Sequence, residues 1–239
     1  MPTDMNLRGL RVAVTGGTSG LGLALVRLLV VRGAHVAFVA RTAGTGERIA
    51  NETGACGIVG DVGRKEDIYA VALQVTGNLG GLDVLINSAS TLGPTPLVLL
   101  ADTECEDLEQ ALMVNLLGPF RLTKALFGAL AASAREGRGA VVINISSDAA
   151  VNAYSGWGAY GSSKAALHHL TAIWAEEEAE GVSFLSLDPG DMDTPLHALA
   201  VPDADPTTLR RPEDAAAEIV ESLLAALPSQ AARLAAVHP

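Results

Sequence analysis

The sequence is short of cysteine, of basic residues and of long apolar runs, and each shortage excludes a class of protein. Its 239 residues include two cysteines, Cys56 and Cys105, too few for a disulfide framework and without metal-ligand spacing. Sixteen Lys and Arg stand against 27 Asp and Glu, and the net charge of −11 disfavours nucleic acid and anionic lipid. We therefore expect no metal, no nucleic-acid partner and no membrane partner.

The absence of long apolar runs bears on whether the protein spans a membrane. No stretch reaches the roughly 18 apolar residues of a membrane span. The first residues, MPTDMNLRGL, show no basic segment followed by an apolar one, so we expect a cytoplasmic protein. With 49% apolar and 18% charged residues the composition is globular, and the length suits one α/β domain over residues 1–239.

Six short apolar runs predict strands. They are rich in Val, Ile and Leu and do not alternate, which is typical of strands buried on both faces of a parallel sheet. The runs are RVAVT from Arg11, AHVAFVA from Ala34, CGIVG from Cys56, LDVLIN from Leu82, AVVINIS from Ala140 and VSFLSL from Val182. Segments of helical length separate them, which predicts a doubly wound Rossmann fold with helices on both faces.

Helices are expected in these connecting segments. The expected ranges are Leu21–Arg32, Lys65–Leu79, Glu106–Arg135 with a break near Pro119, Gly161–Glu180 and Pro212–Ala226. A short last strand at Arg233–Val237 is weakly indicated. The stretch 190–211 is rich in Asp, Pro and Thr and too long for an ordinary connection, so we expect a substrate loop there.

A glycine-rich segment, TGGTSGLG at residues 15–22, follows the first predicted strand and opens the first helix. Glycines let the backbone approach a pyrophosphate, and a helix N-terminus offers free N–H groups and a dipole to an anion. A plain strand-to-helix turn would need one glycine rather than four. We predict a dinucleotide-binding loop with contacts from Gly16, Thr18, Ser19, Gly20, Leu21 and Gly22.

The end of the second predicted strand bears on the choice of nucleotide. A site for NAD would carry Asp or Glu there, but this sequence has Arg41 followed by Thr42. Arg41 can pair with a 2′-phosphate, so we predict a preference for NADP(H) over NAD(H), with a solvated Arg41 as the alternative. Further cofactor contacts are predicted after the third and fourth strands, at Asp61, Val62, Asn87 and Ala89. An Asp before glycine is as often a cap or turn residue as a ligand.

Tyr160 and Lys164 lie four residues apart, on one face of a predicted helix. A cation beside a phenol favours the phenolate and lowers its pKa toward the neutral range, which suits acid–base chemistry. Ser147 follows the fifth strand, where its hydroxyl could bind a substrate oxygen. Each alone could be structural, the pair as a half-buried helix contact and Ser147 as a cap. The carboxyl ends of parallel strands share one edge, however, and that is where ligands bind.

These motifs together resemble the short-chain dehydrogenase/reductase family from about Leu10 to Asp214. The matches are TGxxxGxG at the first turn, Asn115 in VNLLGPF, Ser147 thirteen residues before the tyrosine, YxxxK at Tyr160 and Lys164, and Pro189-Gly190. The resemblance implies that Tyr160 is the general acid in reduction and that Lys164 holds the nicotinamide ribose and lowers the tyrosine pKa. It also implies that Ser147 positions the carbonyl, that Asn115 holds a relay water, and that Met192 and Thr194 lie at the nicotinamide end.

Three departures from the family pattern stand out. The family's NNAG after the fourth strand reads NSAS, so that Ser88 and Ser90 replace an amide and a glycine. Ser19 stands where many NADP-preferring members carry a basic residue. The usual C-terminal Asp-Gly-Gly ending is missing, which leaves a homodimer and a homotetramer both open.

The sequence therefore predicts an NADP(H)-preferring oxidoreductase that moves a hydride between nicotinamide and a small carbonyl or alcohol substrate. Two alternatives stay open, a nucleotide-binding regulator without turnover and a reductase of imines or activated C=C bonds. A regulator without turnover would be expected to have lost Ser147, Tyr160 or Lys164, and all three residues are present. Asp191 and Asp193 after the Pro189-Gly190 turn suggest a neutral or cationic substrate.

Overall fold

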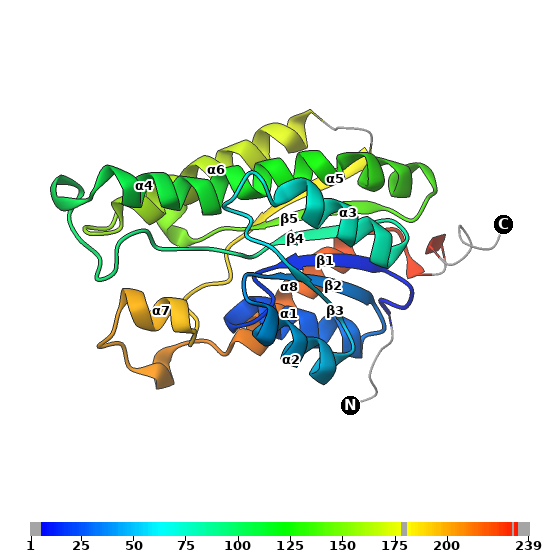
Figure 1. Cartoon of the computed structure of the whole chain (residues 1–239), viewed down its shortest axis with the longest axis horizontal. Coiled ribbons are helices and arrows are strands. Elements are labelled where there is room, and N and C mark those ends of the chain that lie inside the picture. Colours follow the sequence, from blue (N-terminus) through cyan, green and yellow to red (C-terminus); the bar gives the residue numbers. More distant parts are fainter. Residues whose placement is uncertain (1–5, 178–180, 231, 234–239) are drawn as a thin grey trace.

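The computed structural model describes residues 6–177, 181–230 and 232–233, which contain one six-stranded sheet covered by helices on both faces (Figure 1). All strands pair in parallel, in the order β3-β2-β1-β4-β5-β6. The strands are β1 (Arg11–Thr15), β2 (His35–Ala40), β3 (Cys56–Val59), β4 (Val84–Asn87), β5 (Ala140–Ile145) and β6 (Val182–Leu187). The predicted doubly wound sheet is confirmed, and its strand order reverses direction between β1 and β4.

Helices cover the two faces of the sheet in separate layers (Figure 1). One layer holds α1 (Gly20–Val31), α2 (Ala43–Thr53) and α8 (Pro212–Ala226), and the other holds α3 (Ile68–Leu79), α5 (Gly118–Arg135) and α6 (Gly158–Glu176). Side chains alternate along a strand, so Val12 and Val14 pack in the core of the first layer and Ala13 in that of the second. This is why the strands read as unbroken apolar runs.

The sequence did not predict α2. Its segment, AGTGERIANET, carries two glycines and several weak helix formers. Ile49 is fully buried against the sheet, and Gly54 ends the helix with φ of 78°. Burial of one apolar side chain and a left-handed C-cap therefore define a helix that propensity alone would miss.

The other expected helices are confirmed with shifted ends. The long helix is interrupted as expected near Pro119, where a π-helical turn at Met113–Leu117 separates α4 (Cys105–Leu112) from α5. Helix α6 begins at Gly158, three residues before the predicted start. Of the strand suggested at Arg233–Val237, Arg233 is helical and the remainder lies outside the described residues. In the described part of the chain, no helix is both long and apolar enough to cross a membrane.

The stretch 190–211 is anchored at its base and contains a short helix, α7 (Pro195–Ala200). The backbone N–H of Asp193 donates to Arg210 O and that of Arg210 to Asp191 O, both at 2.9 Å. Thr194 caps α7 by accepting the His197 N–H at 3.2 Å. This anchoring holds α7 beside the carboxyl ends of the strands.

Asp83 forms a buried ionic cluster beside the start of β4. Its carboxylate is fully buried and accepts from the guanidinium groups of Arg11 at 2.6 Å and Arg138 at 2.7 Å, and from the Ser133 hydroxyl at 2.6 Å. Burial favours the neutral acid, but hydrogen bonds from Arg138, Arg11 and Ser133 outweigh it and lower the pKa of Asp83 to about 2. The cluster ties β1 and β4 to the turn before β5.

We predict that Asp83→Asn lowers the free energy of unfolding at pH 7 by about 3 kcal/mol, because the largely buried guanidinium groups of Arg11 and Arg138 lose their main counter-ion. A carboxyl with a depressed pKa stabilises the fold fully above its unfolded pKa of about 4. That contribution disappears as the pH falls toward about 2. Urea unfolding should therefore show a gap between wild type and variant that narrows from pH 7 toward pH 3. An equal gap at both pH values would contradict the ionic origin. Glu52→Gln, at an exposed pair with Arg27, is the control and should cost under about 1 kcal/mol.

Candidate active site

A cavity of about 590 Å³ opens at the carboxyl ends of the strands, on the edge where the sequence predicted the site. Of the twenty predicted site residues, it is lined by Gly16, Thr18, Ser19, Gly20, Leu21, Gly22, Arg41, Asp61, Val62, Ala89, Ser147, Tyr160, Lys164, Pro189, Gly190, Met192 and Thr194. These residues come from loops and helix starts far apart in the sequence, which meet because the strands before them are parallel.

Three predicted residues lie outside this lining. Thr42 is exposed at the start of α2. Asn87 is buried and donates to Asn144 Oδ1 at 2.8 Å, inside the protein. Asn115 is fully buried in the π-helical turn. Contacts from these side chains to a cofactor or substrate stay predictions.

The amide of Asn115 uses its full hydrogen-bonding capacity within the protein. Its Nδ2 donates to Thr91 O at 2.8 Å and to Ser163 Oγ at 2.9 Å, and its Oδ1 accepts from Thr91 N at 2.9 Å and Ser90 Oγ at 3.1 Å. The side chain thus ties residues 90 and 91, after β4, to α6. All four of these side-chain bonds stay inside the protein, and the relay water that the resemblance implied for Asn115 stays a prediction.

The glycine loop and α1 form one end of the cavity. Gly16 has φ of 70°, and a Cβ there would lie 2.9 Å from Ala89 Cα, so only glycine lets the two loops meet. Thr15 Oγ1 accepts from the backbone N–H groups of Ser88 and Ala89, each at 3.0 Å. The first turn of α1 carries no acidic residue, so its N–H groups and dipole are open to an anion. This end fits the pyrophosphate of a dinucleotide.

Arg41 and Asp61 lie farther along the same end, after β2 and β3. Arg41 is exposed, and no carboxylate in the described ranges forms an ion pair with it. The Asp61 Oδ1 accepts the Gly63 N–H at 2.8 Å, so the carboxylate stabilises its own turn while it also lines the cavity. The turn role that the sequence left open for Asp61 is present. Arg41 fits a phosphate, because its guanidinium would not have to break an ion pair within the protein in order to bind one.

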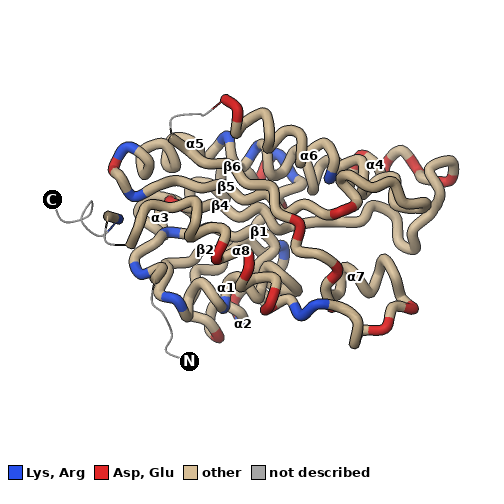
Figure 2. The backbone as a smooth tube through the Cα atoms, turned by 180° about the vertical axis from the view of Figure 1, so that it is seen from behind, with Lys and Arg blue, Asp and Glu red and all other residues tan. Residues whose placement is uncertain are grey.

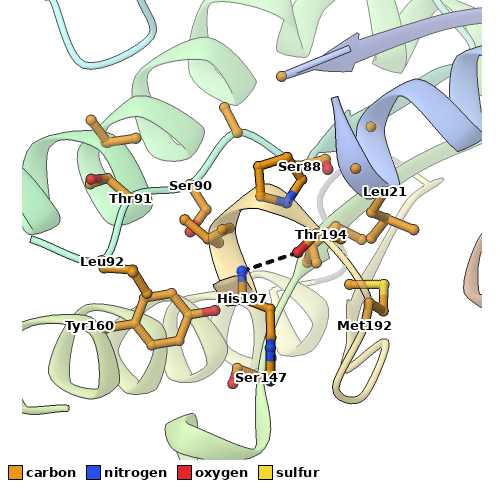
Figure 3. A pocket seen from close by; sticks show the side chains of 18 of the residues that line it. Leu21, Ser88, Ser90, Thr91, Leu92, Ser147, Tyr160, Met192, Thr194 and His197 are labelled. Atoms are coloured by element: carbon orange, nitrogen blue, oxygen red, sulfur yellow. Dashed lines mark hydrogen bonds between the residues drawn. The ribbon is translucent and has the colours of Figure 1, made fainter. Parts of the chain in front are cut away.

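Tyr160, on α6, presents its phenol to the other end of the cavity, between Ser90 and Ser147 in Figure 3. The residue is 8% exposed, and Trp157 contacts the ring edge-on. Burial raises the pKa of Tyr160 to about 12, against the opposing effect of hydrogen bonds with Ser147 and Ser90. Before a nucleotide binds, Tyr160 is therefore a protonated phenol at neutral pH, which suits a proton donor.

In the protein without nucleotide the net shift of the Tyr160 pKa is upward, opposite to the direction that the spacing with Lys164 predicted. Its Nζ lies 5.5 Å from the centroid of the Tyr160 ring and donates to Ile145 O at 2.7 Å. Burial lowers the pKa of Lys164 to about 8, with Asp188 opposing the shift. The ammonium is directed at a backbone carbonyl, and burial of the phenol dominates the tyrosine pKa.

Ser147 follows β5 and lies in the cavity near the phenol. Its Oγ donates to Asp148 Oδ1 and accepts the Ala149 N–H, each at 3.2 Å. Both bonds are long, so the hydroxyl can turn toward a substrate oxygen at little cost. Tyr154, which fails the YxxxK pattern, donates to Asp148 Oδ2 at 2.6 Å and also lines the cavity.

Sequence reasoning missed several residues that line the cavity. Tyr154 and Trp157 come from the segment before α6, and His197, Leu199 and Val201 come from α7 and its end. The signals for α7 in the sequence were Thr194 as a helix cap and Pro195 after it, both within the predicted substrate loop. Asp191 lines the cavity and Asp193 does not, and acidic positions follow the chain around α7 in Figure 2.

Comparison with known proteins agrees with this geometry. Residues 11–205 match the sequence profile of short-chain dehydrogenases. L-fucose dehydrogenase of Mus musculus is 34% identical over 198 residues, which cover 82% of this chain and 70% of that enzyme. A 2,5-dichloro-2,5-cyclohexadiene-1,4-diol dehydrogenase of Sphingobium indicum is 33% identical over 80% of this chain and 76% of its own. The solved structure of a short-chain dehydrogenase from Pseudomonas syringae superposes with a TM-score of 0.81 at 30% identity, covering 94% of this chain and 92% of that one.

Proposed function

Because the chain belongs to the short-chain dehydrogenase/reductase family of oxidoreductases, we propose that it transfers a hydride between NADP(H) and a carbonyl or alcohol group of a small molecule. One observation carries the proposal. The buried phenol of Tyr160 faces Ser147 in the same cavity that holds the glycine loop and the N-terminus of α1. This arrangement supports the binding of a nucleotide and of a substrate oxygen in one connected space.

The residues at the α1 end would hold the nucleotide. The loop at Gly16 and the first turn of α1 would bind its pyrophosphate, and Arg41 would pair with the 2′-phosphate that distinguishes NADP from NAD. Lys164 would hold the nicotinamide ribose, as the family resemblance implies. When bound, the nicotinamide supplies or accepts the hydride.

The residues at the α6 end would manage the proton. In reduction, Ser147 donates a hydrogen bond to the carbonyl oxygen, and the Tyr160 O–H bond breaks as the O–H of the alcohol forms. In oxidation the phenolate of Tyr160 takes that proton back. The name of the diol dehydrogenase relative supports an alcohol as one side of the reaction. Asp191 in the cavity supports a neutral or cationic substrate.

The first test is a titration of the purified protein with NADPH and with NADH, followed by turnover assays on matched ketones, imines and enones. We expect NADPH to bind at least about tenfold more tightly, one Arg–phosphate contact being worth about 1.5–3 kcal/mol. We also expect NADPH oxidation with ketones. Turnover confined to imines or enones would reassign the substrate class. Binding without turnover on any substrate would favour the regulator.

A further inference from the structure

Ser90 places a hydroxyl where the family pattern has a glycine, beside both Asn115 and Tyr160. Its Oγ donates to Asn115 Oδ1 at 3.1 Å, and its side chain lines the cavity. In Figure 3 the Tyr160 hydroxyl points into the space between Ser90 and Ser147. The phenol thus has a serine on each side, and Ser147 is the one that the family motif contains.

The Ser90 O–H can point toward either of two acceptors, Asn115 Oδ1 or the phenolic oxygen of Tyr160, because a hydroxyl rotates freely about its C–O bond. Asn115 Oδ1 also accepts the Thr91 N–H at 2.9 Å, so it keeps a donor if Ser90 turns away. Asn115 then still donates to Thr91 O and Ser163 Oγ. The rotation therefore leaves no buried polar group without a partner.

We propose that Ser90 is a positioning residue for Tyr160, accepting the O–H of the phenol and donating its own O–H to the phenolate once the proton has left. This rests on the proposed role of Tyr160. In reduction the Tyr160 O–H bond breaks and the alcohol O–H bond forms. Ser90 keeps its own proton and only reorients, and the phenolate is later reprotonated from solvent.

The surroundings of Tyr160 explain why the Ser90 hydroxyl would matter for the ionisation of the phenol. Burial and the carboxylates of Asp188 and Asp148 raise the Tyr160 pKa, whereas the hydrogen bonds with Ser147 and Ser90 lower it. Lys164 lies below the ring with its ammonium directed at Ile145 O, and His197 lines the cavity from α7. Without Ser90, Ser147 alone would stabilise the phenolate by a neutral hydrogen bond.

The test follows the ionisation of Tyr160 by ¹³Cζ-tyrosine NMR in the protein without nucleotide. The chain has three tyrosines, so single Tyr→Phe variants assign the signals. In Ser90→Ala, and in Ser90→Gly, which restores the family's residue, the alkaline shift of the Tyr160 signal should begin about one pH unit later than in wild type. Ser90→Thr keeps the hydroxyl and should restore the wild-type onset. Ser88→Ala, two residues earlier on the same loop, is the matched control and should leave the onset unchanged.

An onset in Ser90→Ala equal to that of wild type would overturn the proposal. An onset that is delayed in Ser90→Thr as much as in Ser90→Ala would also overturn it. The NMR readout does not need turnover, so a protein that reduces no carbonyl would refute the proposed function without affecting this test. With an active substrate, Ser90→Ala should lower kcat for reduction about tenfold at constant KM, and Ser90→Thr should recover most of it.

Discussion

Tyr160→Phe should lower kcat for carbonyl reduction about a thousandfold and leave the dissociation constant of NADPH nearly unchanged. The substitution removes the only atom that can give a proton to the substrate oxygen from this position, and general acid catalysis contributes roughly 10²–10⁴ in rate. The ring itself stays packed against Trp157, so the cavity keeps its shape. Steady-state kinetics measure the expected loss of kcat, and a fluorescence titration with NADPH measures the dissociation constant separately.

Tyr154→Phe is the matched control for this result. It removes a phenol hydroxyl from the same cavity, but one that donates to Asp148 and has no role in the proposed proton transfer. We expect its effect to appear mainly in KM, with kcat within about tenfold of wild type. A Tyr160→Phe variant that retains wild-type turnover would refute the assignment of the proton donor.

The direction of the Tyr160 pKa shift gives this prediction a pH dependence. Reduction needs the phenol, and with a pKa near 12 the phenol persists through the neutral and alkaline range. Oxidation needs the phenolate, so its rate should rise with pH over the same range, by as much as tenfold for each pH unit. The rise should be absent in Tyr160→Phe. Rates of both reactions over pH 7 to 10 provide the measurement.

The parts predicted from sequence were those fixed by local patterns. Buried parallel strands need continuous Val, Ile and Leu, so β1 and β5 were readable, and the residue after each strand end was then placed on one edge. The sequence did not predict helix α2, because this helix is stabilised by the packing of Ile49 on the sheet, which no local pattern reveals. The sequence did not predict the part of the cavity lining made by α7, because the position of α7 depends on backbone hydrogen bonds of Arg210 with Asp191 and Asp193.

Two properties of the site depended on three-dimensional surroundings and were predicted wrongly or not at all. The spacing of Tyr160 and Lys164 suggested a lowered phenol pKa, but burial of Tyr160 reverses the direction. The sequence showed that Ser90 replaces a family glycine but gave this hydroxyl no role. In the structure it adds a hydroxyl between Asn115 and Tyr160.

Arg41→Asp should raise the dissociation constant of NADPH about a hundredfold and change that of NADH by less than about threefold. The variant removes a charge-assisted hydrogen bond to the 2′-phosphate and puts a like charge beside it, together worth about 3 kcal/mol. NADH lacks that phosphate, and a carboxylate at this strand end can instead accept from its ribose hydroxyls. Fluorescence titrations with both nucleotides give the ratio directly.

Arg48→Asp is the control that separates this local effect from net charge. Arg48 lies on α2, is well exposed, and changes the net charge by the same amount when replaced. Because Arg48 does not line the cavity and exposed charges are screened at moderate salt, Arg48→Asp should leave both dissociation constants nearly unchanged. Equal losses for NADPH and NADH in Arg41→Asp would mean that Arg41 supports the loop rather than the phosphate. The preference for NADP(H) would then have no residue to carry it, since Ser19 stands where many NADP-preferring members have a basic side chain.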